Sequence, residues 1–305
     1  MLQRERWRLQ SVDLFVRSTV AQKPGEDKER IAPVHTMEHQ LLHQIDLTIR
    51  DGEWVFIVGT NGSGKSTLAR LLAGLGQPRI TGEITRTSSS NAGASFAPLV
   101  TQNPEAALVG MTPAEDATLL LEQLAVPADE MPSRIEAAML VTGLTEWMNQ
   151  PIAQLSGGQK QLAAIAGCIA SGADALIVDE PTAMLDPQAS AAVMASLREL
   201  HRSGTTVVWV TQRLEELQEG DRVVAMKEGC VTFDGRAESF YQRDIGATES
   251  SSPCEEAGLH APYVVQTVWE LQQAGITLDP SMPLTGSSLA KAVSSYAKQQ
   301  QLACQ

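Results

Sequence analysis

Residues 59–67 read Gly59-Thr60-Asn61-Gly62-Ser63-Gly64-Lys65-Ser66-Thr67. They fit the pattern G-x-x-x-x-G-K-[ST] and follow the apolar run Trp54-Val55-Phe56-Ile57-Val58, which predicts a buried strand. A helix is predicted directly afterwards, over 68–75. A strand, a glycine-rich loop and a helix in this order are typical of a phosphate-binding loop (P-loop), whereas an ordinary glycine-rich turn is the weaker interpretation.

The residue types of this loop suit a nucleoside triphosphate. Glycines allow successive backbone N–H groups to curl around phosphate oxygens, and the following helix presents its positive N-terminal end. We expect Lys65 to reach the β- and γ-phosphates and the Ser66 hydroxyl to ligate Mg²⁺. ATP and Mg²⁺ are therefore the predicted cofactors.

Two adjacent carboxylates, Asp179 and Glu180, follow a second apolar run, 175–178. In open α/β sheets, ligands lie at the carboxyl ends of the strands. We expect Asp179 to hold Mg²⁺, directly or through water, and Glu180 to be the general base for the attacking water. Standing alone, the run would be an ordinary strand end, but the P-loop upstream makes it the second half of one site.

The order of the predicted elements favours an α/β fold. Short apolar runs at 175–178 and 206–210 are separated by a predicted helix over 188–202, and this β-α-β order requires a parallel sheet with helices packed against it. Helical periodicity prevails from 112 to 170. An alternating stretch at 9–16 predicts an edge strand, and the polar residues 18–38 that follow read as a long loop.

The composition limits the class of partner. The chain has 305 residues and a formal net charge of −13, so it has no broad electrostatic footprint for nucleic acid or anionic lipid. Its four cysteines include no C-x-x-C pair, which favours reduced thiols in a cytosolic protein. The N-terminus lacks the apolar stretch of a signal peptide, and no apolar run approaches the roughly eighteen residues that span a bilayer. We predict no nucleic-acid partner, and membrane association through a protein.

Residues 155–159 read Leu155-Ser156-Gly157-Gly158-Gln159. Ser156 and the glycine amides lie at a predicted helix N-terminus, which suits a γ-phosphate; a serine N-cap before a flexible turn is the structural alternative. Together with the P-loop and Asp179-Glu180, this stretch resembles the ABC ATPases, whose signature motif is LSGGQ. The resemblance implies a P-loop NTPase (RecA-like) parallel-sheet core, an N-terminal antiparallel β subdomain and an inserted helical subdomain at about 105–170.

The resemblance also implies further site residues. In the family, the signature of one subunit closes over ATP held by another, which implies a head-to-tail dimer with two shared sites. Gln102 resembles the Q-loop glutamine, which touches Mg²⁺ and the attacking water and relays the nucleotide state to the membrane partner; the alternative is a polar residue at a strand end. Asp186 resembles the D-loop aspartate that communicates between the sites, although Asp186-Pro187 is also a good helix start.

Two positions depart from the family pattern. Gln212 occupies the catalytic position where the family usually has a histidine against the γ-phosphate. An amide can donate a hydrogen bond but cannot become an imidazolium or shuttle a proton, so we expect slow hydrolysis at this P-loop. We also expect a related ATPase that keeps the histidine as the second subunit, with a homodimer as the alternative. Val16, with Phe15 beside it, stands where the family stacks an aromatic ring on adenine, so the stacking partner is left open.

The C-terminal stretch narrows the subfamily. Residues 256–263, Trp269-Glu270-Leu271 and 284–292 resemble the small tail of energy-coupling-factor importer ATPases, and Gln102-Asn103-Pro104-Glu105 is similar to that group too. A generic amphipathic helix pair is the alternative for the tail. The predicted division is 1–245 for the nucleotide-binding domain, 246–256 for a linker and 257–305 for a small, mainly helical domain.

The resemblance implies an ATP-hydrolysing importer subunit at the cytoplasmic face of the cell membrane. It would power uptake of a vitamin or a metal ion through a polytopic membrane coupling protein and a substrate-binding membrane subunit. One alternative is a soluble ABC protein acting on ribosomes or DNA, but such chains usually carry tandem nucleotide domains or a long coiled coil. The other is an ATP-binding subunit with weak hydrolysis, which Gln212 favours and Glu180 opposes.

Overall fold

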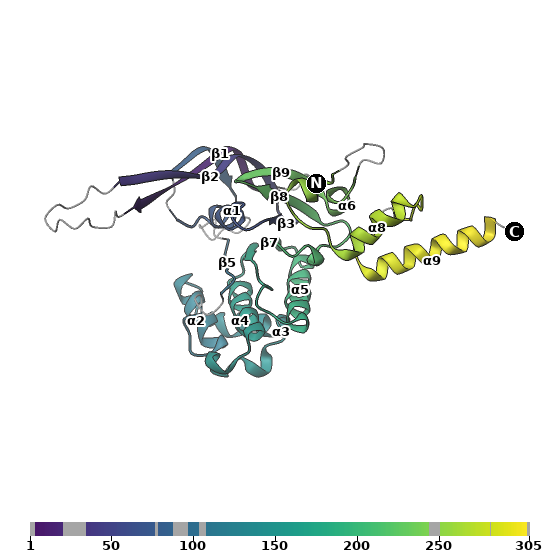
Figure 1. Ribbon diagram of the computed structural model, residues 1–305. Coiled ribbons are helices and arrows are strands. Elements are labelled where there is room, and N and C mark those ends of the chain that lie inside the picture. Colours follow the sequence, from purple (N-terminus) through teal and green to yellow (C-terminus); the bar gives the residue numbers. More distant parts are fainter. Residues whose placement is uncertain are drawn as a thin grey trace, which may run out of the picture.

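Two β-sheets form the centre of the molecule, with helices packed on them and beside them (Figure 1). The structure is a computed structural model that describes residues 4–20, 35–76, 79–87, 97–103, 108–243, 251–280 and 282–303. Among these residues, no helix combines the length and the apolar character that crossing a membrane requires.

The larger sheet has six strands. In spatial order they are β5 (Leu99–Val100), β6 (Ala175–Asp179), β7 (Thr206–Thr211), β3 (Trp54–Gly59), β8 (Arg222–Lys227) and β9 (Cys230–Arg236). The first five are parallel, and β9 returns antiparallel to β8. Because the carboxyl ends of parallel strands meet at one edge, the P-loop after β3, Glu180 after β6 and Gln212 after β7 emerge side by side.

Helices flank this sheet and form a separate lobe below it in Figure 1. They are α1 (Lys65–Leu72) after the P-loop, α2 (Pro113–Gln123), α3 (Met131–Val141) and α4 (Gly157–Ala170) in the lobe, and α5 (Pro187–Arg202) between β6 and β7. Short 3-10 turns lie at Thr145–Trp147, Ile152–Gln154 and Leu214–Glu216, the last of which is η4. The helices predicted within 112–170 and over 188–202 are confirmed, whereas the one predicted over 68–75 begins three residues earlier.

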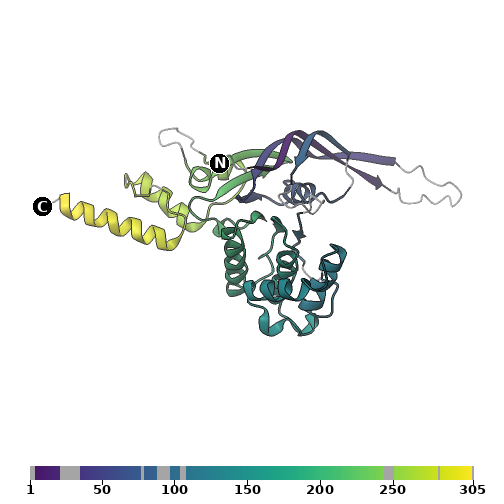
Figure 2. The ribbon, with the colours of Figure 1, turned by 180° about the vertical axis from the view of Figure 1, so that it is seen from behind.

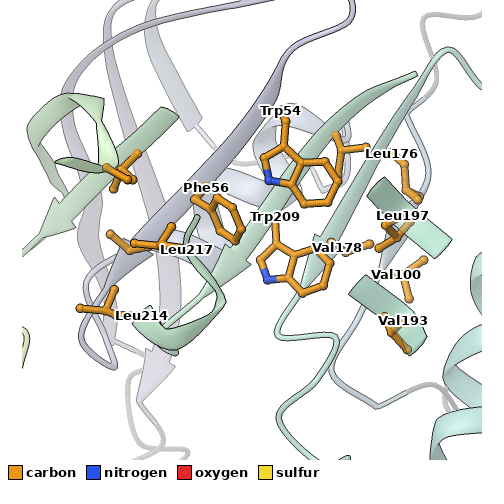
Figure 3. Close-up of a cluster of buried hydrophobic side chains, with 14 of the residues drawn as sticks. Trp54, Phe56, Val100, Leu176, Val178, Val193, Leu197, Trp209, Leu214 and Leu217 are labelled. Atoms are coloured by element: carbon orange, nitrogen blue, oxygen red, sulfur yellow. The ribbon is translucent and has the colours of Figure 1, made fainter. Parts of the chain in front are cut away.

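The central strands separate two hydrophobic cores. On β3, Val55 and Ile57 face α1 and the smaller sheet, whereas Trp54 and Phe56 join the larger core that includes α5 and the lobe. Trp54 stacks on Trp209 of β7 with 5.7 Å between ring centroids (Figure 3). Since both faces are covered, these strands read as uninterrupted apolar runs, which is the pattern from which they were predicted.

The smaller sheet is antiparallel and comes from the N-terminal residues. It contains β1 (Glu5–Val20), β2 (His35–Arg50) and β4 (Arg79–Arg86), in the order β2-β1-β4. The edge-strand prediction for 9–16 is therefore wrong, because β1 pairs with a strand on each side. The loop predicted over 18–38 is wrong at both ends, since β1 extends to Val20 and β2 begins at His35; residues 21–34 lie outside the described ones.

The C-terminal residues pack against the larger core, and the last helices of the chain extend away from it (Figure 2). These helices are α6 (Ala237–Phe240), α7 (Pro253–Glu256), α8 (Tyr263–Gln273) and α9 (Gly286–Ala303). The linker predicted over 246–256 stays a prediction; within it, Ser252 caps α7 and Cys254 is fully buried. Arg243 bonds Glu255 and lies 3.6 Å from the centre of the Trp269 ring, which anchors the tail. The division at 245 stays a prediction, whereas the predicted fold class is confirmed.

Candidate nucleotide site

The P-loop between β3 and α1 has a backbone that requires glycine at two positions. Gly64 has φ of +100°, a left-handed conformation, and a Cβ there would lie 3.1 Å from Leu42. At Gly59 a Cβ would lie 2.4 Å from the carbonyl oxygen of Met226. Helix α1 begins at Lys65, so its first amides point into the loop without helical carbonyl partners. The loop is therefore a concave backbone surface that suits phosphate oxygens.

Lys65 places its ammonium inside this loop. Its Nζ donates to the carbonyl oxygens of Gly59 at 2.9 Å and Thr60 at 3.0 Å, and the residue is 6% exposed. Burial lowers the pKa of the Lys65 amine, and the carboxylates of Glu180 and Asp179 oppose that shift by favouring the charged form. The Lys65 ammonium is thus held inside the P-loop by two carbonyl oxygens of the loop itself.

Asp179 is the last residue of β6, is 8% exposed and lies near the Ser66 hydroxyl. Burial raises the pKa of the Asp179 carboxyl, and Ser66, Lys65 and Arg70 oppose the shift. Its Oδ1 is buried and has no hydrogen-bond partner among the described residues. A carboxylate with an unpaired oxygen beside a hydroxyl is the kind of oxygen donor set that Mg²⁺ takes, so these residues fit that ion.

Glu180 occupies a strained turn directly after β6. Its φ is +51°, unusual for a residue with a side chain, and its backbone N–H donates to Val210 of β7 at 2.8 Å. Burial raises the pKa of the Glu180 carboxyl; Lys65 and the backbone N–H of Gln212 oppose the shift. Its Oε2 is buried and unpaired among the described residues. Strain held in this way is common where a side chain is aimed at a ligand.

One cleft of about 490 Å³ brings half of the predicted site residues together. It is lined by Leu41, Asn61, Gly62, Gly64, Lys65, Ser66, Thr67, Gln102, Glu180 and Gln212. Gln102 reaches it from the segment after β5, and Gln212 from the segment after β7. The P-loop, the proposed base and both glutamines therefore face a single space, although their individual roles stay predictions.

The signature residues lie outside that cleft. Ser156 caps α4, accepting from the Gln159 amide at 3.2 Å while its own N–H donates to the Gln159 side chain. Gly157 lines a neighbouring cleft of about 420 Å³ with Gln102 and the Pro181–Leu185 side of the next loop. Asp186 caps α5 by accepting from the Ala189 amide at 2.9 Å. In the single chain, Ser156 and Asp186 thus have helix-capping roles, and nothing places them at their own P-loop.

A larger cleft, about 660 Å³, adjoins the phosphate site. Leu41 and Thr67 line both clefts, so the two spaces are neighbours. The larger cleft includes Val16, which is 41% exposed, and Phe15, which has the Arg79 guanidinium 5.5 Å from its ring centre. A base entering here would contact aliphatic side chains and a phenyl ring that already has a cationic neighbour.

Sequence reasoning missed several residues of this region. Leu41 carries no recognisable signal, because one exposed leucine on a strand is common. Glu216, Thr182 and Trp209 were also missed, although they are bonded to one another beside Glu180. A buried glutamate is rare without a partner, but burial cannot be deduced from the polar stretch 213–219, and only the fold brings that stretch beside Thr182.

Comparison with known proteins agrees with this geometry. The model of the ABC transporter family matches residues 42–183. Energy-coupling factor transporter ATP-binding protein EcfA1 of Halalkalibacterium halodurans is 35% identical over 264 residues, covering 84% of this chain and 91% of that protein. The corresponding EcfA protein of Methanosarcina acetivorans is 34% identical over 258 residues, which cover 83% of this chain and 91% of that protein.

Solved structures resemble the chain over most of its length. CbiO1 from Clostridium perfringens, part of the ABC transporter complex CbiONQ, has a TM-score of 0.62 at 23% identity and covers 89% of this chain and 96% of its own; at that identity it supports the fold alone. A dimeric ATP-binding cassette bound to ADP and Pi has a TM-score of 0.57 at 26% identity and covers 75% of this chain and 98% of its own. With the P-loop, the signature motif and these relatives in agreement, the chain belongs to the energy-coupling factor transporter ATP-binding proteins of the ABC transporter family.

Proposed function

We propose that the chain binds and hydrolyses ATP as the motor subunit of an energy-coupling-factor importer. The observation that carries the proposal is the cleft in which the P-loop, Gln102, Glu180 and Gln212 face one another. A phosphate cradle, a buried carboxylate and two amides at one space are the groups that phosphoryl transfer to water requires.

Each side chain has a distinct task in that reaction. The P-loop amides and Lys65 hold the phosphates and neutralise charge that develops as the bond to the γ-phosphorus breaks. The carboxylate of Glu180 accepts the proton of the water that attacks this phosphorus. Ser66, Asp179 and Gln102 would hold Mg²⁺, which supplies further neutralisation of the phosphate charge when it is bound.

The glutamine at position 212 supports a second candidate function, that of an ATP-binding subunit with weak hydrolysis. The residue lines the phosphate cleft together with Glu180, and it follows β7, where the family histidine is expected. Its amide can donate a hydrogen bond but stays neutral. Slow turnover at this P-loop is therefore expected, while the presence of Glu180 keeps the site catalytic.

A second ATPase subunit is the first proposed partner. Ser156 to Gln159 begin α4 and do not line the phosphate cleft of their own chain, so a second subunit would supply a signature to this P-loop. We propose a heterodimer in which a related subunit keeps the histidine. Asp186, at the start of α5, would lie between the two sites.

Membrane proteins are the remaining proposed partners. CbiO1 is described as part of a transporter complex, and the curated relatives are named as subunits of transporters. We propose that a polytopic coupling protein docks beside Gln102, that a separate membrane subunit binds the cargo, a vitamin or a metal ion, and that the chain sits at the cytoplasmic face of the membrane. The net charge of −13 disfavours direct binding to nucleic acid or anionic lipid.

Affinity purification of the tagged chain from detergent-solubilised cells tests this assignment. A polytopic membrane protein and a second ATPase should co-purify, and addition of Mg-ATP to the complex should release phosphate. Recovery of ribosomal or nucleic-acid partners alone would support a soluble ABC protein instead. ATP binding without phosphate release would favour the weakly hydrolysing subunit.

A further inference from the structure

Glu216, in the turn η4, is buried between two loops of the nucleotide site. Its side chain is only 9% exposed. One carboxylate oxygen accepts a hydrogen bond from the Trp209 indole N–H at 2.8 Å, and the other accepts from the Thr182 hydroxyl. In Figure 3 the indole nitrogen of Trp209 lies on the side of the ring that faces the η4 segment.

These two donors belong to the strand and the loop that carry the groups proposed for catalysis. Thr182 lies two residues after Glu180, and Trp209 lies three residues before Gln212. Arg213 adds a second connection between the loops, because its guanidinium donates to the Thr182 carbonyl at 3.0 Å. The backbone bond from Glu180 to Val210 closes the ring of contacts. We call this set, Thr182, Trp209, Arg213 and Glu216, the Glu216 clamp.

We propose that Glu216 is a positioning residue for ATP hydrolysis, which holds the Glu180 loop and the Gln212 loop at a fixed separation. This inference rests on the proposed function, since it concerns the geometry of the same reaction. Hydrolysis needs the carboxylate and the amide to meet one water and one phosphate, and displacement by about 1 Å can cost about 100-fold in rate. Glu216 touches neither group that reacts, so it positions them through the loops, while its negative charge separately raises the pKa of the Glu180 carboxyl.

The geometry separates this role from simple stabilisation of the core. Glu180 has a strained φ of +51°, and a conformation of this kind persists only where the surroundings enforce it. Thr182 is held at both ends, its hydroxyl by Glu216 and its carbonyl by Arg213. The clamp therefore holds the turn that begins at the strained residue and connects it to Trp209, a fully buried member of the larger hydrophobic core.

Three variants of the full-length chain test the proposal, in complex with the partners that co-purify. Glu216→Met keeps the approximate volume and removes both acceptors. Glu216→Gln retains the bonds, because its amide oxygen can accept from Trp209 while its NH₂ donates to the Thr182 hydroxyl. Thr182→Val is nearly isosteric and breaks one bond only. Glu215→Gln is the matched control, since Glu215 is the exposed neighbour of Glu216.

We expect Glu216→Met to lower kcat by about 10- to 100-fold with the Kd for ATP unchanged, and Thr182→Val to lower it less. Glu216→Gln and the Glu215→Gln control should stay within about threefold of wild type. Hydrogen exchange should accelerate in Glu216→Met at the amides of Ala183 and Leu185, which close the turn after Glu180. Both readouts should be rescued by glutamine.

Several outcomes would overturn the clamp. One is hydrogen exchange in Glu216→Met that is unchanged, or that is faster while kcat stays at the wild-type value. Another is an equal loss of kcat in Glu216→Met and Glu216→Gln. A third is a rise in the Kd for ATP in Glu216→Met as large as the fall in kcat. If Glu216→Met does not fold, Thr182→Val is judged by the same criteria. A wild-type complex without turnover would instead overturn the proposed function, and the exchange comparison would still decide whether the clamp exists.

Discussion

Backbone amides and buried charges line the phosphate end of the nucleotide cleft, whereas exposed apolar side chains and three arginines line the neighbouring space, where we propose that the base lies. Lys65 is 6% exposed and bonded to two carbonyls of its own loop. Val16 is 41% exposed and Leu41 39% exposed, and both line the neighbouring space. The difference indicates that affinity for the triphosphate is built into the fold, while recognition of the base depends on a few replaceable side chains.

The largest effect is expected at the phosphate end. Glu180→Gln should lower kcat by about 10²- to 10⁴-fold, because the amide cannot accept the proton of the attacking water. ATP binding should persist, since Lys65 and the P-loop are untouched. Steady-state turnover together with equilibrium ATP binding measures both quantities, with Glu215→Gln as a control at an exposed glutamate. Turnover close to wild type would remove Glu180 from the role of base.

The same contrast explains which residues could be predicted from the sequence. The P-loop and Asp179-Glu180 could be identified because local chain geometry decides their role: a glycine with φ of +100° and a strand that ends in carboxylates are encoded in a few neighbouring residues. The meeting of the P-loop and Glu180 in one cleft followed from the parallel order of the strands. The edge assignment of 9–16 failed because pairing with β4 depends on residues about seventy positions away.

Contacts between segments that are far apart in the chain account for the other features that were not predicted. Leu41 lies beside the P-loop only because β2 crosses the start of α1, and a Cβ at Gly64 would lie 3.3 Å from the Leu41 carbonyl oxygen. Ser252 and Cys254, in the second half of the predicted linker, are buried because α7 meets Arg243 and the core, although the composition of Ser, Glu and Pro there is typical of a loop. The composition of a segment indicates how polar it is, whereas its burial depends on which other segments pack against it in the fold.

Gln212 is the position where the phosphate end departs from its family, and a substitution there sharpens the comparison. We expect Gln212→His to raise kcat by about tenfold, because a charge-assisted hydrogen bond to phosphate is worth about 1.4 kcal/mol more than a neutral one. The gain should be larger near pH 6 than pH 8, since the imidazole charges around its ordinary pKa. Turnover across that pH range measures the effect.

Gln212→Asn is the matched control for this test. It keeps an amide but shortens it, so it should not increase turnover at any pH. A Gln212→His variant with wild-type kcat would show that the amide does not limit the reaction, and slow turnover would then have to arise elsewhere in the cleft.

The smallest expected effect lies at the base end, where one aromatic ring should change affinity without touching the phosphates. Val16→Tyr offers a face on which adenine can stack, worth about 1 kcal/mol, so the Kd for ATP should fall about fivefold. Val16→Thr has nearly the same shape and no ring, and should leave the Kd unchanged. Tripolyphosphate, which carries no base, should bind both variants as it binds wild type. If Val16→Tyr tightened tripolyphosphate as well, the substitution would be acting through the P-loop, and the separation of the two ends would be wrong.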